Sequence, residues 1–373
     1  MERKRYNIAS EVLLLLFAII EIIAKAKIQS ENFANAVIAG SGLLCLIHTI
    51  LHYSFIRRRL LQIGVIFSLL LLVNVVATGN SSISHLLWIW GYLGFAALFY
   101  SNGLSNRVST VIYIIYTLFF CYSAFTGLET DADELLISGS SNNISTMYIF
   151  GISLYYITKY RENPLTNMPY MPILVLGMLS IWAANRSGVL CTIFLASLII
   201  TYNTMKTGKA FVRNILLVAV FSIGIYIFFD VFMDQFGISF LQKENRTGTE
   251  STRTLIWAQY IQACLNDPMY ILLGVPSSDS TVFGFHLYNG NAHNAFFMLH
   301  SNFGIVGLII IIIAVVKFYI YSFRRKMYPI AIIFSAIVLR SMFDWTGFCG
   351  IFDVFFWYIM FETSIQGIYK SVK

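Results

Sequence analysis

Long apolar runs, separated by short polar stretches, constrain the fold of this chain more than any other feature. A helix needs about 20 apolar residues to cross a membrane, and roughly twelve runs in the chain approach that length. Only 12% of the residues are charged, whereas about a quarter are charged in soluble domains. The sequence therefore predicts an all-α polytopic membrane protein. The expected spans are residues 8–24, 33–55, 60–78, 85–101, 108–127, 145–160, 169–185, 187–204, 213–230, 298–321, 328–344 and 350–369.

The distribution of basic residues predicts how these spans are oriented. Loops that stay in the cytoplasm keep Lys and Arg, and translocated loops lose them. The clusters at residues 3–5, 57–59 and 324–326 all fall on one side, which we interpret as the cytoplasm, so both termini are expected there. The net charge of +7 reflects this topology and an attraction to anionic lipid, and no basic domain suggests nucleic-acid binding. The lipid bilayer is the expected partner.

We predict a single membrane domain over residues 1–373, with a large extracytoplasmic loop at residues 231–297 between the ninth and tenth spans. Within the loop, Ser251 or Thr252 can cap a helix that runs to about Asn266 and stops at Asp267-Pro268. One face of this helix is apolar, so the helix is expected to lie on the outer membrane surface or over the bundle. That face comprises Leu255, Ala258, Ile261 and Leu265. Residues 292–313 are predicted to form one helix with His293 in its first turn.

Three arginines on the external side are candidates for binding an anion. They are Arg186 at a junction between two spans, and Arg246 and Arg253 in the long loop. The guanidinium group is always charged and can grip a phosphate with two hydrogen bonds. Each could instead anchor a lipid headgroup or form an ion pair within the loop.

His293 is the candidate general base, because a histidine can exchange a proton near neutral pH. An interfacial histidine without a catalytic role is the alternative. Arg340 and Asp344 lie four residues apart, which favours a structural ion pair over a catalytic one. The five cysteines show no metal-binding or disulfide spacing, and an Asp131-Ala-Asp133 pattern is a weak signal for a cation site.

Several motifs in a fixed order resemble the bacterial O-antigen ligase and polysaccharide polymerase family. They are Asn185-Arg-Ser-Gly, Thr252-Arg-Thr-Leu-Ile-Trp, Asn266-Asp-Pro, Leu272-Leu-Gly-Val and Ala292-His-Asn-Ala-Phe-Phe, spread over residues 181–308. Thr252 stands where many relatives have Gly, and Pro276 stands where Gly is frequent. These departures leave Arg246 as an alternative to Arg253.

The resemblance implies a fold like that of GT-C glycosyltransferases and an enzyme that joins undecaprenyl-diphosphate-linked oligosaccharide units with inversion, without metal or other cofactor. Arg186 and Arg253 would neutralise the diphosphate and His293 would activate the acceptor hydroxyl. The candidate substrate-binding residues are Arg246, Asn294, His300 and Trp257. The site would face the periplasm or exterior of a bacterial inner or plasma membrane, with a chain-length regulator and a flippase as partners.

A repeat-unit polymerase is the favoured interpretation. An O-antigen ligase would use the same chemistry on a different acceptor. A flippase or other transporter of lipid-linked oligosaccharide is the alternative from another class, but transporters often show paired halves and midplane charged sites, which this sequence does not clearly contain.

Overall fold

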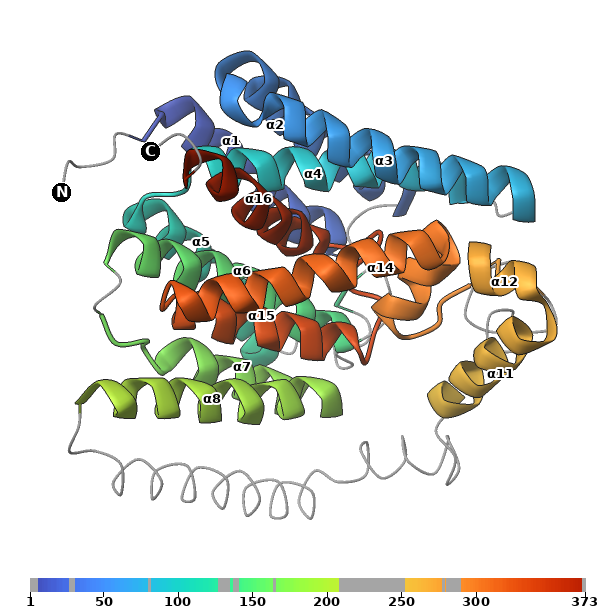
Figure 1. Ribbon diagram of the computed structural model, residues 1–373. Coiled ribbons are helices and arrows are strands. Elements are labelled where there is room, and N and C mark those ends of the chain that lie inside the picture. Colours follow the sequence, from blue (N-terminus) through green and yellow to red (C-terminus); the bar gives the residue numbers. More distant parts are fainter. Residues whose placement is uncertain are drawn as a thin grey trace, which may run out of the picture.

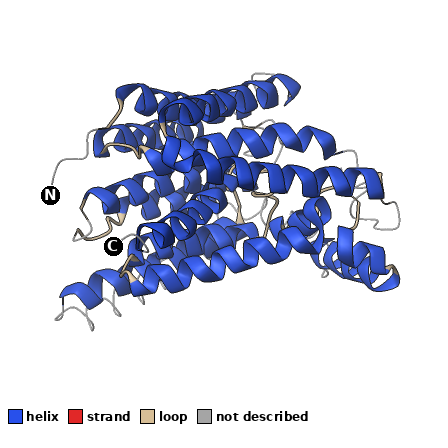
Figure 2. Ribbon diagram, turned by 45° about the horizontal axis from the view of Figure 1, so that its top comes forward, coloured by secondary structure: helices blue, strands red, loops and turns tan. Residues whose placement is uncertain are grey.

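The computed structural model describes residues 6–26, 31–79, 82–126, 135–136, 141–163, 166–207, 252–276, 279 and 290–370. Over these ranges the chain forms helices and connecting loops without a strand, apart from a bridge between Ala26 and Leu136 (Figure 2). The predicted all-α fold is confirmed to that extent. The described helices are α1 (Ile8–Lys25), α2 (Glu31–His52), α3 (Ser54–Thr78), η1 (Ser82–Ser84), α4 (His85–Ser101), α5 (Asn106–Thr126), α6 (Asn142–Glu162), α7 (Met171–Trp182), α8 (Arg186–Thr207), α11 (Thr252–Asn266), α12 (Pro268–Leu273), α14 (Ala295–Arg324), α15 (Tyr328–Ser341) and α16 (Asp353–Lys370).

Among the described residues, five helices are long and apolar enough to cross a membrane. They are Asn32–His52, Ser54–Thr78, Asn106–Thr126, Arg186–Met205 and Ala295–Arg324. Several such helices indicate a multi-pass membrane protein. The full set of twelve crossings and the cytoplasmic placement of both termini stay predictions, and the predicted span at residues 213–230 lies outside the described residues.

The helices pack side by side, and α11, α12 and the start of α8 lie at one end of the bundle. Figure 1 shows α1 beginning and α16 ending at the same end, whereas α11 and α12 lie at the other end. Helix α4 packs against α2 and α16, and α8 packs against α7 and α15. Helix α8 begins at the end of the bundle where α11 and α12 lie.

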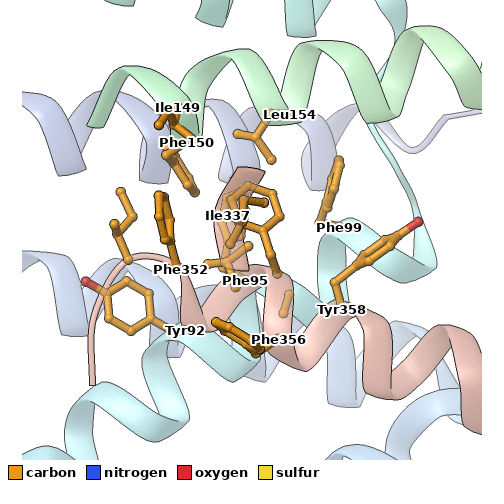
Figure 3. Packing of buried hydrophobic residues seen from close by; sticks show 14 of the residues in the cluster. Tyr92, Phe95, Phe99, Ile149, Phe150, Leu154, Ile337, Phe352, Phe356 and Tyr358 are labelled. Atoms are coloured by element: carbon orange, nitrogen blue, oxygen red, sulfur yellow. The ribbon is translucent and has the colours of Figure 1, made fainter. Parts of the chain in front are cut away.

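Aromatic side chains fill the centre of the bundle, where α4, α6 and α16 meet (Figure 3). The Phe95 and Phe150 rings lie 6.0 Å apart, and the Phe150 and Phe355 rings lie 5.7 Å apart. All three side chains are buried. Because lipid is as apolar as these side chains, close packing rather than hydrophobic burial holds such helices together inside a membrane.

Two glycines let α12 pack directly on a kink in α14. Gly304 has φ 64° and ψ −171°, a conformation that is almost restricted to glycine. A Cβ atom at Gly304 would lie 2.3 Å from the Leu272 carbonyl oxygen, and one at Gly274 would lie 2.0 Å from the His300 carbonyl oxygen. The kink leaves the Ser301 carbonyl to accept a hydrogen bond from Asn74 Nδ2 at 2.9 Å. The backbones of α12 and α14 therefore touch directly at these two glycines, because neither glycine has a side chain to hold them apart.

We expect Gly304→Ala to lower stability markedly. The backbone strain alone costs about 1–3 kcal/mol, and the new methyl group meets a carbonyl that cannot rotate away. Gly40→Ala in α2 is the matched control, because no atom lies within 4 Å of a Cβ there. Thermal unfolding of the purified protein checks this, and equal midpoints for the two variants would contradict the proposed close contact.

Candidate functional site

His293 lies in a tight turn immediately before α14. Its backbone N–H donates to Asn291 Oδ1 at 2.7 Å, and its φ of 49° lies in the left-handed region, which histidine adopts more readily than most residues. Asn294 caps the helix, since its Oδ1 accepts from the backbone N–H groups of Phe296 and Phe297. The prediction that a helix from Ala292 carries His293 in its first turn is therefore wrong. The cap at Asn294 starts the helix at Ala295 and leaves His293 outside it.

Asp344 lies beside His293, in the loop between α15 and α16. His293 Nδ1 is 3.6 Å from Asp344 Oδ1, slightly longer than a direct hydrogen bond. Catalytic contacts are often long without substrate and shorten in the complex. Asn294 Nδ2 also donates to the Met342 carbonyl at 3.0 Å, so the two loops are joined at a second point.

The charge of Asp344 is maintained by its surroundings. Burial alone raises the pKa of this carboxyl. The contact with His293 and the positive charges of Arg340 and Arg253 outweigh burial, and they hold the pKa of Asp344 well below its usual range. Asp344 is therefore a carboxylate at any physiological pH. A carboxylate facing Nδ1 favours the tautomer with a proton on Nδ1 and the lone pair on Nε2.

Arg340 is fully buried at the end of α15 and links Asp344 to α6. Its Nη2 is 3.2 Å from Asp344 Oδ2 and donates to the Asn142 carbonyl at 2.7 Å, and its Nε donates to Ser145 Oγ at 3.3 Å. The predicted ion pair between Arg340 and Asp344 is thus present. The sequence did not indicate that the same carboxylate also contacts His293.

Asn185 binds the same two oxygen atoms at the start of α6. Its Nδ2 donates to the Asn142 carbonyl at 3.2 Å and to Ser145 Oγ at 2.6 Å. Its Oδ1 accepts from Ser187 Oγ and from the Gly188 backbone N–H, which fixes the start of α8. Arg186 is the first residue of α8 and is exposed. The start of α6 therefore supports both the α8 segment that carries Arg186 and the pair of Arg340 and Asp344.

Arg253 lies in the first turn of α11, partly buried, and its charge acts on Asp344. The structure thus brings two candidate site residues, Arg253 and His293, into one region with Asp344, the predicted ion-pair partner of Arg340. Arg186 begins α8 at the same end of the bundle (Figure 1). Arg246 lies outside the described residues, so its predicted role stays a prediction.

Of the remaining predicted substrate-binding residues, Trp257 and Asn294 make hydrogen bonds that support the His293 turn, whereas His300 joins α14 to α11 and α12. Trp257 Nε1 donates to the Ala292 carbonyl at 2.9 Å. His300 Nε2 donates to the Ile271 carbonyl at 2.8 Å, which leaves Nδ1 as the acceptor for the Tyr260 hydroxyl, also at 2.8 Å. Both ring nitrogens of His300 are therefore occupied within the protein. The predicted substrate-binding roles of these residues stay predictions.

Comparison of the chain with protein-family models, with curated proteins and with solved structures gives no match. The geometry of the site therefore carries the functional argument.

The arrangement places a histidine beside a carboxylate with which two arginines interact. The charges of Arg340 and Arg253 exceed that of Asp344 by one, and Arg186 lies at the start of α8. Within the described residues, no group of three or more His, Cys, Asp or Glu side chains could hold a metal ion. Such a site can bind an anion and remove a proton from a nearby hydroxyl group.

Proposed function

We propose that this protein is an inverting membrane glycosyltransferase that joins oligosaccharide units carried on undecaprenyl diphosphate. The contact between Asp344 and His293, with Arg340 and Arg253 beside it, is the observation that carries this proposal. A histidine oriented by a buried carboxylate suits deprotonation of a hydroxyl. Nearby arginines suit a diphosphate leaving group. The order of motifs in the sequence supports the same class.

In the proposed reaction, the acceptor hydroxyl oxygen attacks the anomeric carbon of the donor as the bond from that carbon to the diphosphate oxygen breaks. His293 Nε2 takes the hydroxyl proton, a role that contributes typically about 10²–10⁴ in rate. The diphosphate leaves with the electron pair of the broken bond, and the proton is then released to the diphosphate or to water. Attack opposite the leaving group inverts the anomeric centre.

Arg253 and Arg186 are proposed to stabilise the charge that develops on the diphosphate. Fixed cations in a partly dehydrated site act more strongly than they do in water, because little reorganisation is needed as the bond breaks. Arg340 has a different role in this scheme. It is fully buried and bonded to Asp344 and α6, so it positions the carboxylate and does not contact the substrate.

We favour a repeat-unit polymerase, in which both donor and acceptor are lipid-linked, over a ligase, which differs in its acceptor. The proposed location is a bacterial inner or plasma membrane, with the site on the periplasmic or external face. A chain-length regulator and a flippase are the protein partners that this reaction implies.

Substitution in cells that depend on the protein for surface polysaccharide tests the proposal. We expect His293→Ala and Arg253→Ala to insert normally in the membrane but to make no polymer, with single repeat units accumulating on the external leaflet. His52→Ala and Arg58→Ala are matched controls, because both residues are exposed and lie around the junction of α2 and α3, far from the site in sequence. Full-length polymer from both site variants would contradict the site assignment. Repeat units trapped on the cytoplasmic leaflet would indicate a flippase instead.

A further inference from the structure

Among the residues that the structure describes, helix α11 packs on the bundle through one face. Ile256 and Tyr260 on that face are buried, and the Tyr260 ring stacks on Phe297 of α14 at 4.9 Å. The Tyr260 hydroxyl also binds His300. This face is therefore occupied by the protein itself.

The opposite face of α11 is mostly apolar and exposed, with the exposed Gln262 among its apolar side chains, and the exposed surface continues along α12. The exposed fractions are 42% for Leu255, 49% for Ile261, 73% for Leu265, 53% for Met269, 42% for Ile271 and 55% for Leu272. We call this set the hairpin patch. Ala258 is exposed between its members, so the apolar face predicted from the sequence points away from the bundle. A contiguous apolar patch of this kind indicates an interaction surface.

The contacts of α12 place the hairpin patch at the level of surfaces that face lipid. Asn74 Nδ2 donates to the Leu273 carbonyl, so the end of α12 is bonded to α3 beside Val73, which is 55% exposed. The Leu272 carbonyl lies against Gly304 of α14, two residues from Val306, which is 51% exposed. Helices α3 and α14 are both long and apolar enough to cross a membrane. The hairpin patch is thus continuous with their outward apolar side chains.

The charges of this segment fit the same environment. Residues 252–273 carry only Arg253 and Asp267 as charged residues, one in the first turn of α11 and the other at the turn between the helices. An amphipathic helix that lies in a membrane interface buries its apolar side and keeps polar groups at headgroup depth. An arginine at that depth meets lipid phosphates.

We propose that the α11–α12 hairpin is immersed in one membrane leaflet, with the hairpin patch in the hydrocarbon and Arg253 at the level of the headgroup phosphates. The occupant of the patch is the phospholipid of the bilayer. This immersion holds the α11 end of the candidate site at the membrane surface. It does not depend on the proposed glycosyltransferase function.

Photo-crosslinking of the full-length protein in phosphatidylethanolamine and phosphatidylglycerol vesicles tests the proposal. The photoreactive residue p-benzoylphenylalanine replaces Leu265 or Leu272, and peptides are analysed by mass spectrometry. Val76, 84% exposed on α3, is the lipid-facing reference, and Asn163, exposed after α6, is the polar control. We expect a mass increase equal to one phospholipid at Leu265 and Leu272, to an extent comparable with Val76, and little at Asn163.

Three results would overturn the immersion proposal. A crosslink at Leu265 and Leu272 to a second copy of the chain or to another protein would assign the hairpin patch to a protein partner. Labelling at these positions no higher than at Asn163, while Val76 is labelled, would place the patch in water. Absence of a phospholipid adduct at Val76 would remove the lipid-facing surface with which the patch is continuous.

Discussion

Asp344→Asn is expected to reduce glycosyl transfer per folded molecule by roughly 10²–10⁴-fold, the range that a positioned general base contributes. An amide has nearly the shape of the carboxylate but can present its NH₂ group to His293. The ring can then turn or adopt the other tautomer, and Nε2 no longer carries the lone pair toward the acceptor. The measurement is the initial rate with saturating lipid-linked donor, normalised to folded protein.

Asp267→Asn is the matched control for this substitution. Asp267 caps α12 by accepting from the Met269 backbone N–H at 2.8 Å, and asparagine caps helices about as well as aspartate. Its rate should stay within about twofold of the wild type because the cap is kept. If Asp344→Asn also kept a wild-type rate, the carboxylate would have no part in orienting His293.

Arg340→Met is expected to lower the free energy of unfolding by about 3–5 kcal/mol, because it leaves Asp344 buried without its closest cation. The double variant Arg340→Met with Asp344→Leu should recover a large part of this loss, since it removes both charges. The Asn142 carbonyl and Ser145 Oγ keep a donor in both variants, namely Asn185 Nδ2. Unfolding at pH 7 in a mild detergent measures these differences.

A second ion pair, with a partly exposed arginine and a buried glutamate, lies at the other end of the bundle and provides the comparison. Arg161 lies 3.8 Å from Glu362, with 24% of its own side chain exposed. It also lies over the Tyr358 ring at 5.2 Å. We expect Arg161→Met to cost less than Arg340→Met, because the Arg161 side chain is partly exposed and its contact with Glu362 is longer than the 3.2 Å contact between Arg340 and Asp344, so less attraction is lost. A double variant at Arg340 and Asp344 as unstable as Arg340→Met alone would contradict the buried-pair account.

The helices could be predicted from the sequence because each depends on local pattern. Apolar runs bounded by polar residues indicated α3 and α14, although α3 begins at Ser54, six residues before its predicted span, and Thr252 and Asn266 bound α11 as expected. Asp267-Pro268 ended α11 but also started α12, since aspartate is a good cap and proline fits the first helical turn. A stop signal for one helix is thus a start signal for the next.

The site was only partly predictable, because its decisive contact joins segments that are distant in the chain. His293 and Asp344 have α14 and α15 between them in the sequence, and only the packing of these helices brings the two side chains together. The four-residue spacing of Arg340 and Asp344 correctly indicated an ion pair. It could not indicate that Arg340 also bonds to Asn142, which lies on α6.

The start of α14 shows how a local signal can mislead. The apolar residues after Ala292 continue the periodicity of the helix, so the sequence favoured a start at that point. The side chains of Asn291 and Asn294 instead bond to nearby backbone N–H groups and form a turn, in which His293 takes a positive φ. Strained backbone of this kind is common at functional sites.

Purified protein in vesicles with a defined undecaprenyl-diphosphate-linked repeat unit, and no nucleotide or added metal, tests the central claim most directly. We predict a ladder of polymer with inverted linkages from the wild type and none from His293→Ala at equal amounts of folded protein. No glycosidic bond formation by the wild type with a matched repeat unit, or an equal ladder from His293→Ala, would contradict the account.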